Sequence, residues 1–255
     1  MTESKQPPAR RCVIVVPCYN EAARLDTHVF LDYAANQPEI RLVFVNDGST
    51  DNTMTVLRRM QAEVPSIDVL DKSTNGGKAE AVREGMRRAM GTDGAEIVGF
   101  WDADLATPLD AIADLLHVMD TNPRIDIVIG ARVKLLGRQI ERKPMRHYLG
   151  RVFATFASMT LELPIYDTQC GAKLFRVTPT LDAVLEKPFL SRWIFDVELI
   201  ARMVQAQPRS GKLVRECLYE FPLSCWRDIP GSKLKTGDFV KAVSELWRIR
   251  REYFQ

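Results

Sequence analysis

The sequence predicts a single α/β domain built on a mostly parallel sheet with helices on both faces. Two observations lead to this prediction. Short apolar runs alternate with segments of helical periodicity through the first half of the chain. Each apolar run is followed by Pro, Gly, Asn or Asp, the residues that typically close a strand. A chain of 255 residues is long enough to bury a large core in one such domain.

Five strands are expected, over 12–16, 41–45, 67–70, 96–101 and 125–129. The expected helices cover 21–35, 53–63, 77–90, 108–119 and 195–204. The segment 236–255 has apolar residues at helical spacing, which predicts a C-terminal amphipathic helix. We therefore divide the chain into a disordered lead over 1–10, a domain over 11–235 whose halves meet after residue 130, and this terminal helix.

Composition excludes several classes of protein. The net charge of +2 is too small to suggest a nucleic-acid partner. The five cysteines form no CxxC pair, so the spacing of a zinc site is absent, and their odd number is typical of reduced thiols in the cytosol. No stretch approaches the roughly 20 apolar residues of a membrane span. We expect a cytoplasmic protein.

Polar clusters follow three of the expected strands. Tyr19 and Glu21 follow the first strand, Asp47 follows the second, and the triplet Asp102-Ala103-Asp104 follows the fourth. In parallel sheets, ligands bind beyond the carboxyl ends of the strands. These residues, distant in sequence, are therefore expected to line one cleft.

The Asp102-Ala103-Asp104 triplet predicts a metal site. Two carboxylates two residues apart at a strand end can both face Mg²⁺ or Mn²⁺ and leave positions open for phosphate oxygens. The metal would neutralise charge on a departing diphosphate. A lone triplet of this kind is also typical of a helix cap with a solvated acid. The neighbouring motifs are what favour a metal site here.

Three further motifs accompany the triplet. A strand runs into Pro17 and then Tyr19-Asn20-Glu21. Asp47 can accept hydrogen bonds from a uracil or guanine edge, although Asp-Gly-Ser is also an ordinary turn. Asn75-Gly76-Gly77-Lys78 can present backbone amides and a lysine to phosphate at a helix N-terminus. It lacks the Walker A spacing, which disfavours ATPase chemistry.

These four motifs, in this order, resemble the inverting family-2 glycosyltransferases of the GT-A fold over about residues 12–129. The resemblance implies that Asp104 binds the metal together with Asp102. It also implies contacts with the nucleotide-sugar by a larger set of residues, namely Pro17, Tyr19, Glu21, Asp47, Lys78, Asp102 and Ala103.

The second half resembles the dolichyl-phosphate glucosyltransferases. The matching stretches are 130–132, 167–175, 192–199 and 231–234. This resemblance implies UDP-glucose ahead of GDP-mannose as donor, and a polyprenyl phosphate as acceptor. Ala172 stands where the family pattern usually has phenylalanine.

The segment 132–151 is rich in basic residues and suits an anionic acceptor, unless it is simply a solvated loop. The stretch 148–161 is apolar with flanking arginines, as in an interfacial helix or a core helix. We therefore expect peripheral contact with the cytoplasmic face of a membrane, or else an acceptor that is not a lipid.

We expect a single in-line displacement at the anomeric carbon by this hexosyltransferase. A phosphate acceptor is already ionised, whereas a hydroxyl acceptor would need a general base, for which Asp167 is preferred over Asp196. Asp167 alternatively caps a turn. Arg132 and Arg192 are assigned to the acceptor or the diphosphate, although Arg192-Trp193 alternatively forms a buried packing pair.

Four other functions stay open. They are a soluble transferase acting on a saccharide or protein hydroxyl, a GDP-mannose-dependent polyprenyl-phosphate mannosyltransferase, a non-catalytic nucleotide-sugar-binding protein and, less favoured, a nucleotidyltransferase.

Overall fold

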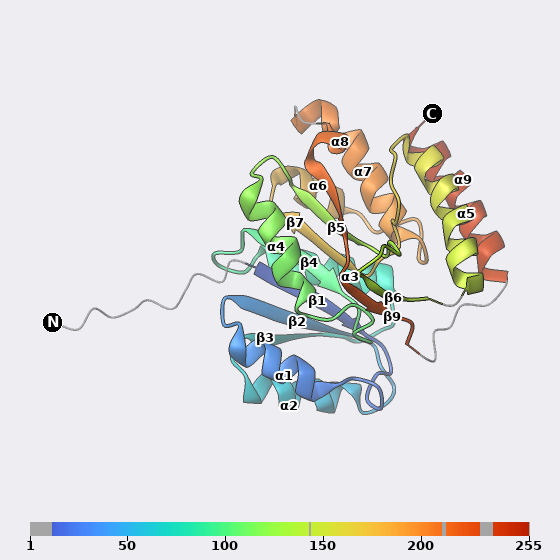
Figure 1. Ribbon diagram of the computed structural model, residues 1–255. Coiled ribbons are helices and arrows are strands. Elements are labelled where there is room, and N and C mark those ends of the chain that lie inside the picture. The colour runs from blue at the N-terminus through green and yellow to red at the C-terminus, as the bar shows by residue number, and fades with distance from the viewer. Residues whose placement is uncertain (1–11, 143, 211–212, 230–236, 255) are drawn as a thin grey trace.

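The computed structural model describes residues 12–142, 144–210, 213–229 and 237–254. The predicted lead over 1–10 and the segment 231–234 lie outside the described residues. Figure 1 shows a central twisted sheet between layers of helices. The predicted α/β class is confirmed.

Seven strands form the central sheet in the order β3-β2-β1-β4-β7-β5-β8. They are β1 (Cys12–Cys18), β2 (Ile40–Asp47), β3 (Ile67–Lys72), β4 (Ile97–Trp101), β5 (Ile127–Ala131), β7 (Ala172–Arg176) and β8 (Leu218–Pro222). Only β7 runs antiparallel to its neighbours β4 and β5, so the sheet is mostly parallel. A separate ribbon pairs β6 (Gln139–Glu141) with β9 (Cys225–Arg227).

The two faces of the sheet are covered by different helices. One face packs against α1 (Thr27–Asn36), α2 (Thr53–Glu63) and α4 (Ala111–Thr121). The other packs against α3 (Lys78–Met90), α5 (Pro144–Leu161), α6 (Pro179–Glu186), α7 (Phe195–Ser210) and α9 (Gly237–Tyr253). A short helix, α8 (Val214–Cys217), precedes β8. Alternate residues of β1 serve the two cores, as the two-residue period of a strand requires.

The first helix is shorter than predicted. We expected a helix from residue 21, but α1 begins at Thr27 and Asp26 caps it by accepting from the amide of Val29. Aspartate is a strong N-cap residue because its carboxylate satisfies a free amide of the first turn. Residues 21–25 form a turn in which the amides of Arg24 and Leu25 bond the carbonyl of Glu21. The loop after β1 is therefore long enough to reach the neighbouring loops.

Strand β7 was not predicted. Its second residue, Lys173, is fully buried, and this charged residue interrupts the apolar pattern from which the other strands were predicted. The basic segment 132–151 is not simply a solvated loop, because it contains β6 and the first part of α5. Within the described ranges, no helix is both long enough and apolar enough to cross a bilayer.

Candidate functional site

The Asp102-Ala103-Asp104 triplet forms a tight turn where β4 ends. The amide of Asp102 donates to the carbonyl of Gly171 at 3.0 Å, and Asp104 Oδ1 accepts from the amide of Ala106 at 3.1 Å. Glycine at 171 lets the Asp102 carboxylate lie where it does, because a Cβ there would lie 1.9 Å from Asp102 Oδ2 and the carboxylate would have to move. Ala103 is buried, which leaves the two acids as the polar groups of the triplet.

The electrostatics of the two acids fit a divalent cation. Partial burial and the charge of Asp102 raise the pKa of Asp104. Such repulsion between neighbouring carboxylates is relieved by a cation, and carboxylate oxygens are the ligands that Mg²⁺ and Mn²⁺ prefer. Among the described residues, no group of three or more His, Cys, Asp or Glu side chains is arranged for a metal. An ion held by Asp102 and Asp104 would take its other ligands from water and phosphate.

Lys78 connects the first turn of α3 to the triplet, because its ammonium forms an ion pair with Asp102. Desolvation alone would lower the pKa of Lys78, but the carboxylates of Asp102, Asp196 and Asp104 raise it. The side chain is 44% exposed, so it is accessible to a ligand. Lys78 and the triplet therefore lie together at the strand ends, as the sequence suggested.

Asp47 faces the glycine loop, residues 75–78, instead of open solvent. Asp47 is 2% exposed, and its carboxylate accepts from the amides of Gly76 at 2.9 Å and Gly77 at 2.7 Å. Lys72 Nζ lies 2.8 Å from Asp47 Oδ1. We expected the glycine amides to meet phosphate and Asp47 to meet a base. Instead, the buried carboxylate captures the free amides at the start of α3, a favourable place for an anion.

The loops after β1 and β2 are tied together. The amide of Asn20 donates to Ser49 Oγ at 3.0 Å, and the amide of Glu21 donates to Thr53 Oγ1 at 2.8 Å. Pro17 lies near the end of β1, and Tyr19 is 39% exposed beside it. The structure therefore brings Pro17, Tyr19 and Glu21 to the sheet edge that also carries Asp47.

Arg192 reaches the same edge from the second half of the chain. Its guanidinium packs over Gly77, where a Cβ would lie 3.3 Å from both Nε and Nη2. Arg192 is exposed and Trp193 is 44% exposed, so the alternative of a buried packing pair is wrong. This contact places a guanidinium next to the residue that precedes Lys78.

Arg132 and Asp167 form a buried ion pair. Arg132 Nε donates to Asp167 Oδ2 at 2.7 Å and Nη2 donates to Oδ1 at 2.8 Å, while the backbone amide of Arg132 adds a third bond. Burial would raise the pKa of Asp167, but Arg132 outweighs it and lowers the pKa to about 2. Asp167 also caps its turn through the amide of Gln169. Asp167, the preferred general base, therefore has little affinity for a proton because it is ion-paired. The guanidinium of Arg132 is likewise occupied by this ion pair.

A second buried pair was missed by the sequence reasoning. Lys173 Nζ lies 2.5 Å from both Asp196 Oδ1 and the carbonyl oxygen of Cys170. Lys173 thus ties the start of α7 to the turn that contains Gly171, which contacts Asp102. The available signal was a lone lysine between Ala172 and the apolar pair that follows it.

Two more arginines of the basic segment, Arg142 and Arg151, lie near the Arg132–Asp167 pair. A Cβ at Gly150 would lie 2.4 Å from Arg142 Nη2, so the guanidinium packs on α5. Burial and Arg132 lower the pKa of Arg142 to about 10. Arg151 donates to the carbonyl of Tyr166 at 2.9 Å, and its guanidinium lies 3.6 Å from the centroid of the Tyr166 ring. The side chains at 143, 146 and 147 lie outside the described residues.

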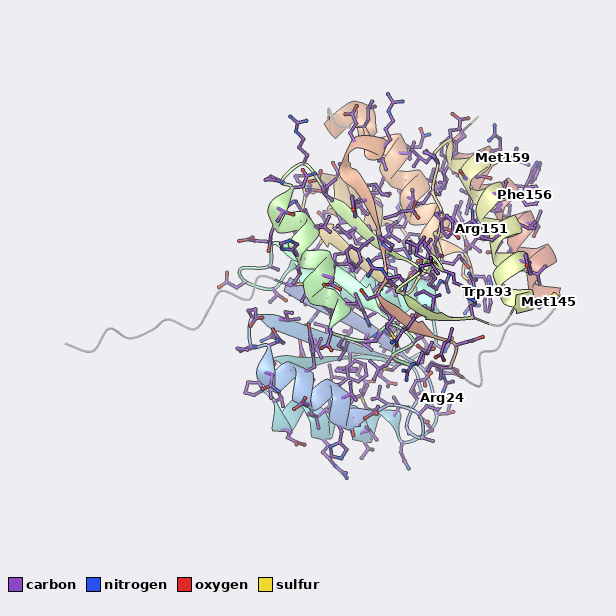
Figure 2. The ribbon with its side chains drawn as sticks, viewed as in Figure 1. Arg24, Met145, Arg151, Phe156, Met159 and Trp193 are labelled. Atoms are coloured by element: carbon purple, nitrogen blue, oxygen red, sulfur yellow. The ribbon has the colours of Figure 1, made fainter. Side chains whose placement is uncertain are left out.

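Helix α5 has one buried face and one exposed apolar face. Phe153, Ala157 and Leu161 are buried in the core. The exposed residues recur at helical spacing, and Figure 2 labels three of them; the set is Met145, Tyr148, Leu149, Val152, Phe156 and Met159. Helix α9 lies beside α5 and adds Trp247, which is 61% exposed. The helix thus has the core face that one expectation gave it, and its other face is apolar and exposed.

Comparisons with known proteins agree with this geometry. The model of the family "Glycosyl transferase family 2" matches residues 13–181. A dolichyl-phosphate beta-glucosyltransferase of Trichomonas vaginalis is 33% identical over 250 residues, which cover 92% of this chain and 69% of that protein. The dolichyl-phosphate beta-glucosyltransferase of Saccharomyces cerevisiae is 29% identical, over 94% of this chain and 74% of that protein.

Solved structures share the fold. Glucosyl-3-phosphoglycerate synthase of Mycobacterium tuberculosis, solved with Mn²⁺, UDP and glucosyl-3-phosphoglycerate, has a TM-score of 0.67 at 18% identity, over 96% of this chain and 81% of that one. A mannosyltransferase of Pyrobaculum calidifontis, solved with GDP-mannose and Mn²⁺, has a TM-score of 0.58 at 20% identity, over 94% and 60%. The described structure therefore has the GT-A fold that the sequence implied. The chain belongs to glycosyl transferase family 2 and is a glycosyltransferase.

Proposed function

We propose that this enzyme transfers glucose from UDP-glucose to a polyprenyl phosphate, with inversion at the anomeric carbon. The observation that carries the proposal is the convergence of Lys78, Arg192 and the Asp102–Asp104 pair at one edge of the sheet. Acids and cations so arranged suit a nucleotide diphosphate with its metal. The relatives whose names state this activity align with most of the chain.

Each residue of the donor side has a defined role in this proposal. Asp102 and Asp104 hold the divalent ion, which when bound neutralises charge on the departing diphosphate. Lys78 leaves its ion pair with Asp102 in part and turns to a phosphate oxygen, since its ammonium is exposed. Arg192 contacts the diphosphate from the opposite side through its planar guanidinium. Tyr19, Glu21 and the loop held by Asp47 border the nucleoside.

The acceptor side requires no strong base. The acceptor phosphate oxygen forms the new bond to the anomeric carbon while the bond to the UDP oxygen breaks, and the electron pair leaves with UDP. A phosphate monoester is ionised near neutral pH, so no proton has to be removed first. Asp167 is ion-paired with Arg132, which agrees with a reaction that needs no general base. Arg142 and Arg151 give this side a positive charge that suits an anionic acceptor.

We further propose that helices α5 and α9 contact the lipid surface that contains the acceptor. Their apolar face is exposed, and α9 adds exposed arginines, of which Arg251 lies 5.6 Å over the Trp247 ring. Apolar side chains flanked by cations are typical of helices that lie in the interface of an anionic bilayer.

The direct test is transfer of radiolabel from UDP-glucose to polyprenyl phosphate in detergent micelles with Mn²⁺. We expect label in the lipid extract, less or none with GDP-mannose, and none when the metal is chelated. Parallel reactions with a free saccharide or a protein acceptor test the hydroxyl alternatives. Failure of both nucleotide-sugars to label the lipid would overturn the proposed acceptor.

A further inference from the structure

The loop between α6 and α7 carries Arg192 to the donor side. Residues 187–194 form no regular secondary structure, and Arg192 and Trp193 are both exposed. The loop backbone nevertheless keeps the Arg192 guanidinium over Gly77. An exposed arginine on an irregular loop would otherwise sample many positions, so the contacts that hold this loop decide where Arg192 lies.

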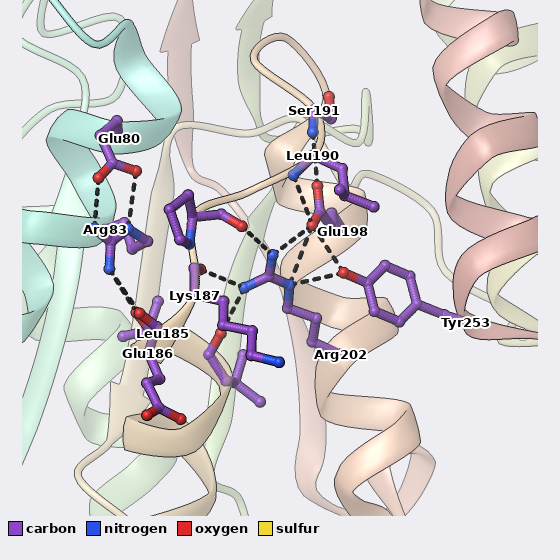
Figure 3. Close-up of polar contacts among 12 residues, drawn as sticks. Glu80, Arg83, Leu185, Glu186, Lys187, Leu190, Ser191, Glu198, Arg202 and Tyr253 are labelled. Atoms are coloured by element: carbon purple, nitrogen blue, oxygen red, sulfur yellow. Dashed lines mark hydrogen bonds and ion pairs between the residues drawn. The ribbon is translucent and has the colours of Figure 1, made fainter.

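A single buried carboxylate holds the two residues that precede Arg192. Glu198 is 0% exposed, and its oxygens accept from the amide of Leu190 at 3.0 Å and from the amide of Ser191 at 2.8 Å. Figure 3 shows Glu198 reaching up from α7 to both amides. Bonds from backbone amides to a charged carboxylate are stronger than neutral hydrogen bonds, and their geometry is fixed.

Arg202, one turn further along α7, holds the start of the same loop. Its Nη2 donates to Glu198 Oε1 at 2.7 Å and to the carbonyl of Pro188 at 2.6 Å, and its Nη1 donates to the carbonyl of Lys187 at 2.7 Å. Arg83 of α3 holds the end of α6 in the same way, by donating to the carbonyl of Leu185 at 2.9 Å (Figure 3).

The C-terminal helix α9 completes this network. The hydroxyl of Tyr253 donates to Glu198 Oε1 at 3.0 Å and accepts from Arg202 Nε at 3.1 Å. A second link joins Ser191 Oγ to Glu245 Oε2 at 2.5 Å. The helix that presents Trp247 to solvent is therefore bonded directly to the loop that presents Arg192.

We infer that Glu198, Arg202 and Tyr253 act as positioning residues, which hold Arg192 at the diphosphate site and make its placement depend on α9. The inference rests on the proposed function, because it takes Arg192 as a contact of the donor diphosphate. The proposed function assigns none of the three a contact with the donor. Their effect on transfer passes through the loop backbone to Arg192.

A double-mutant cycle between Tyr253→Phe and Arg192→Ala tests this inference. The phenylalanine keeps the ring and removes both hydrogen bonds of the hydroxyl, so we expect kcat/KM for UDP-glucose to fall at least about fivefold. In the Arg192→Ala background, Tyr253→Phe should change kcat/KM by less than about twofold, because the group it positions is gone. A purely structural role predicts the same factor in both backgrounds, and that result would overturn the inference.

Tyr219→Phe is the matched control, since it makes the same change at an exposed position of β8. It should leave kcat/KM unchanged in both backgrounds. Glu198→Gln keeps the side-chain volume and should lower kcat/KM more than Tyr253→Phe, and its thermal melting curve checks that it folds. Tyr253→Phe keeps the test decisive if Glu198→Gln does not fold.

Limited trypsin digestion tests the loop without any substrate. Cleavage after Arg192 requires the loop to open, and it tracks the population of the open form. Tyr253→Phe should speed this cleavage about fivefold, while Tyr219→Phe should not. Equal rates in wild type and Tyr253→Phe would overturn the inference. If the wild type transfers no glucose, the proposed function fails, and the digestion still decides whether the loop is held in this way.

Discussion

Replacing Gly171 with alanine should disable the proposed metal site without replacing either acid. The new Cβ would lie 1.9 Å from Asp102 Oδ2 and 2.1 Å from Cγ. Carbon and oxygen in weak contact stay about 3.3 Å apart. The carboxylate must therefore retreat by roughly 1.4 Å, since the hydrogen bond from the Asp102 amide to the Gly171 carbonyl pins the two backbones together. A misplacement of about 1 Å at a reacting centre can cost about 100-fold in rate.

We therefore expect Gly171→Ala to lower kcat about 100-fold, or about 2.7 kcal/mol in barrier height. The assay is Mn²⁺-dependent transfer from UDP-glucose, together with calorimetric titration of UDP in the presence of Mn²⁺. Gly91→Ala is the control, because its φ is −77° and the nearest atom to a new Cβ is 3.5 Å away. A folded Gly171→Ala enzyme with wild-type kcat and UDP affinity would refute the reasoning about Asp102.

Three further predictions concern the proposed metal site, the Arg132–Asp167 ion pair and the proposed membrane contact. Asp104→Asn should abolish the Mn²⁺ dependence of UDP binding in calorimetry, and retained dependence would contradict the role of Asp104. Because the pKa of Asp167 is lowered to about 2 by Arg132, the pair stabilises the fold above pH ~4 and this contribution, about 2 kcal/mol, is lost as the pH falls toward 2. Denaturant titration of Asp167→Asn should show lower stability at pH 7 and a flatter profile below pH 4; a wild-type profile would refute this. Trp247→Ser should weaken flotation with anionic liposomes, whereas unchanged flotation would exclude α9 from the contact.

The parallel half of the fold could be predicted because its signals are local. Apolar runs closed by turn residues gave β1 to β5 in order, and α2 lies at its predicted bounds, 53–63. The start of α1 was misplaced because Asp26 competes as a cap with the acid at position 21. Strand β7 was missed because a buried Lys173 interrupts its apolar pattern, and the Asp196 carboxylate and the Cys170 carbonyl together make that burial possible.

The candidate site was predictable in its location but not in its pairings. Motifs at strand ends placed Asp102, Asp104 and Lys78 together, because strand order alone brings them to one edge. Which acid is free and which is paired depends on contacts across long sequence distances. Asp167 meets Arg132 from 35 residues away, so its low proton affinity has no local signal. The contact of Arg192 with Gly77 likewise depends on how the loop before α7 is held.

The most direct test of the central claim is a crystal structure of the enzyme soaked with UDP and Mn²⁺, with data collected at the manganese absorption edge. The account predicts one strong anomalous peak about 2.1 Å from carboxylate oxygens of Asp102 and Asp104, with the diphosphate completing the ligands of the ion. It also predicts Lys78 and Arg192 in contact with phosphate oxygens. A peak elsewhere on the molecule, or a diphosphate bound away from this turn, would contradict the assignment of these two acids as the donor-site metal ligands.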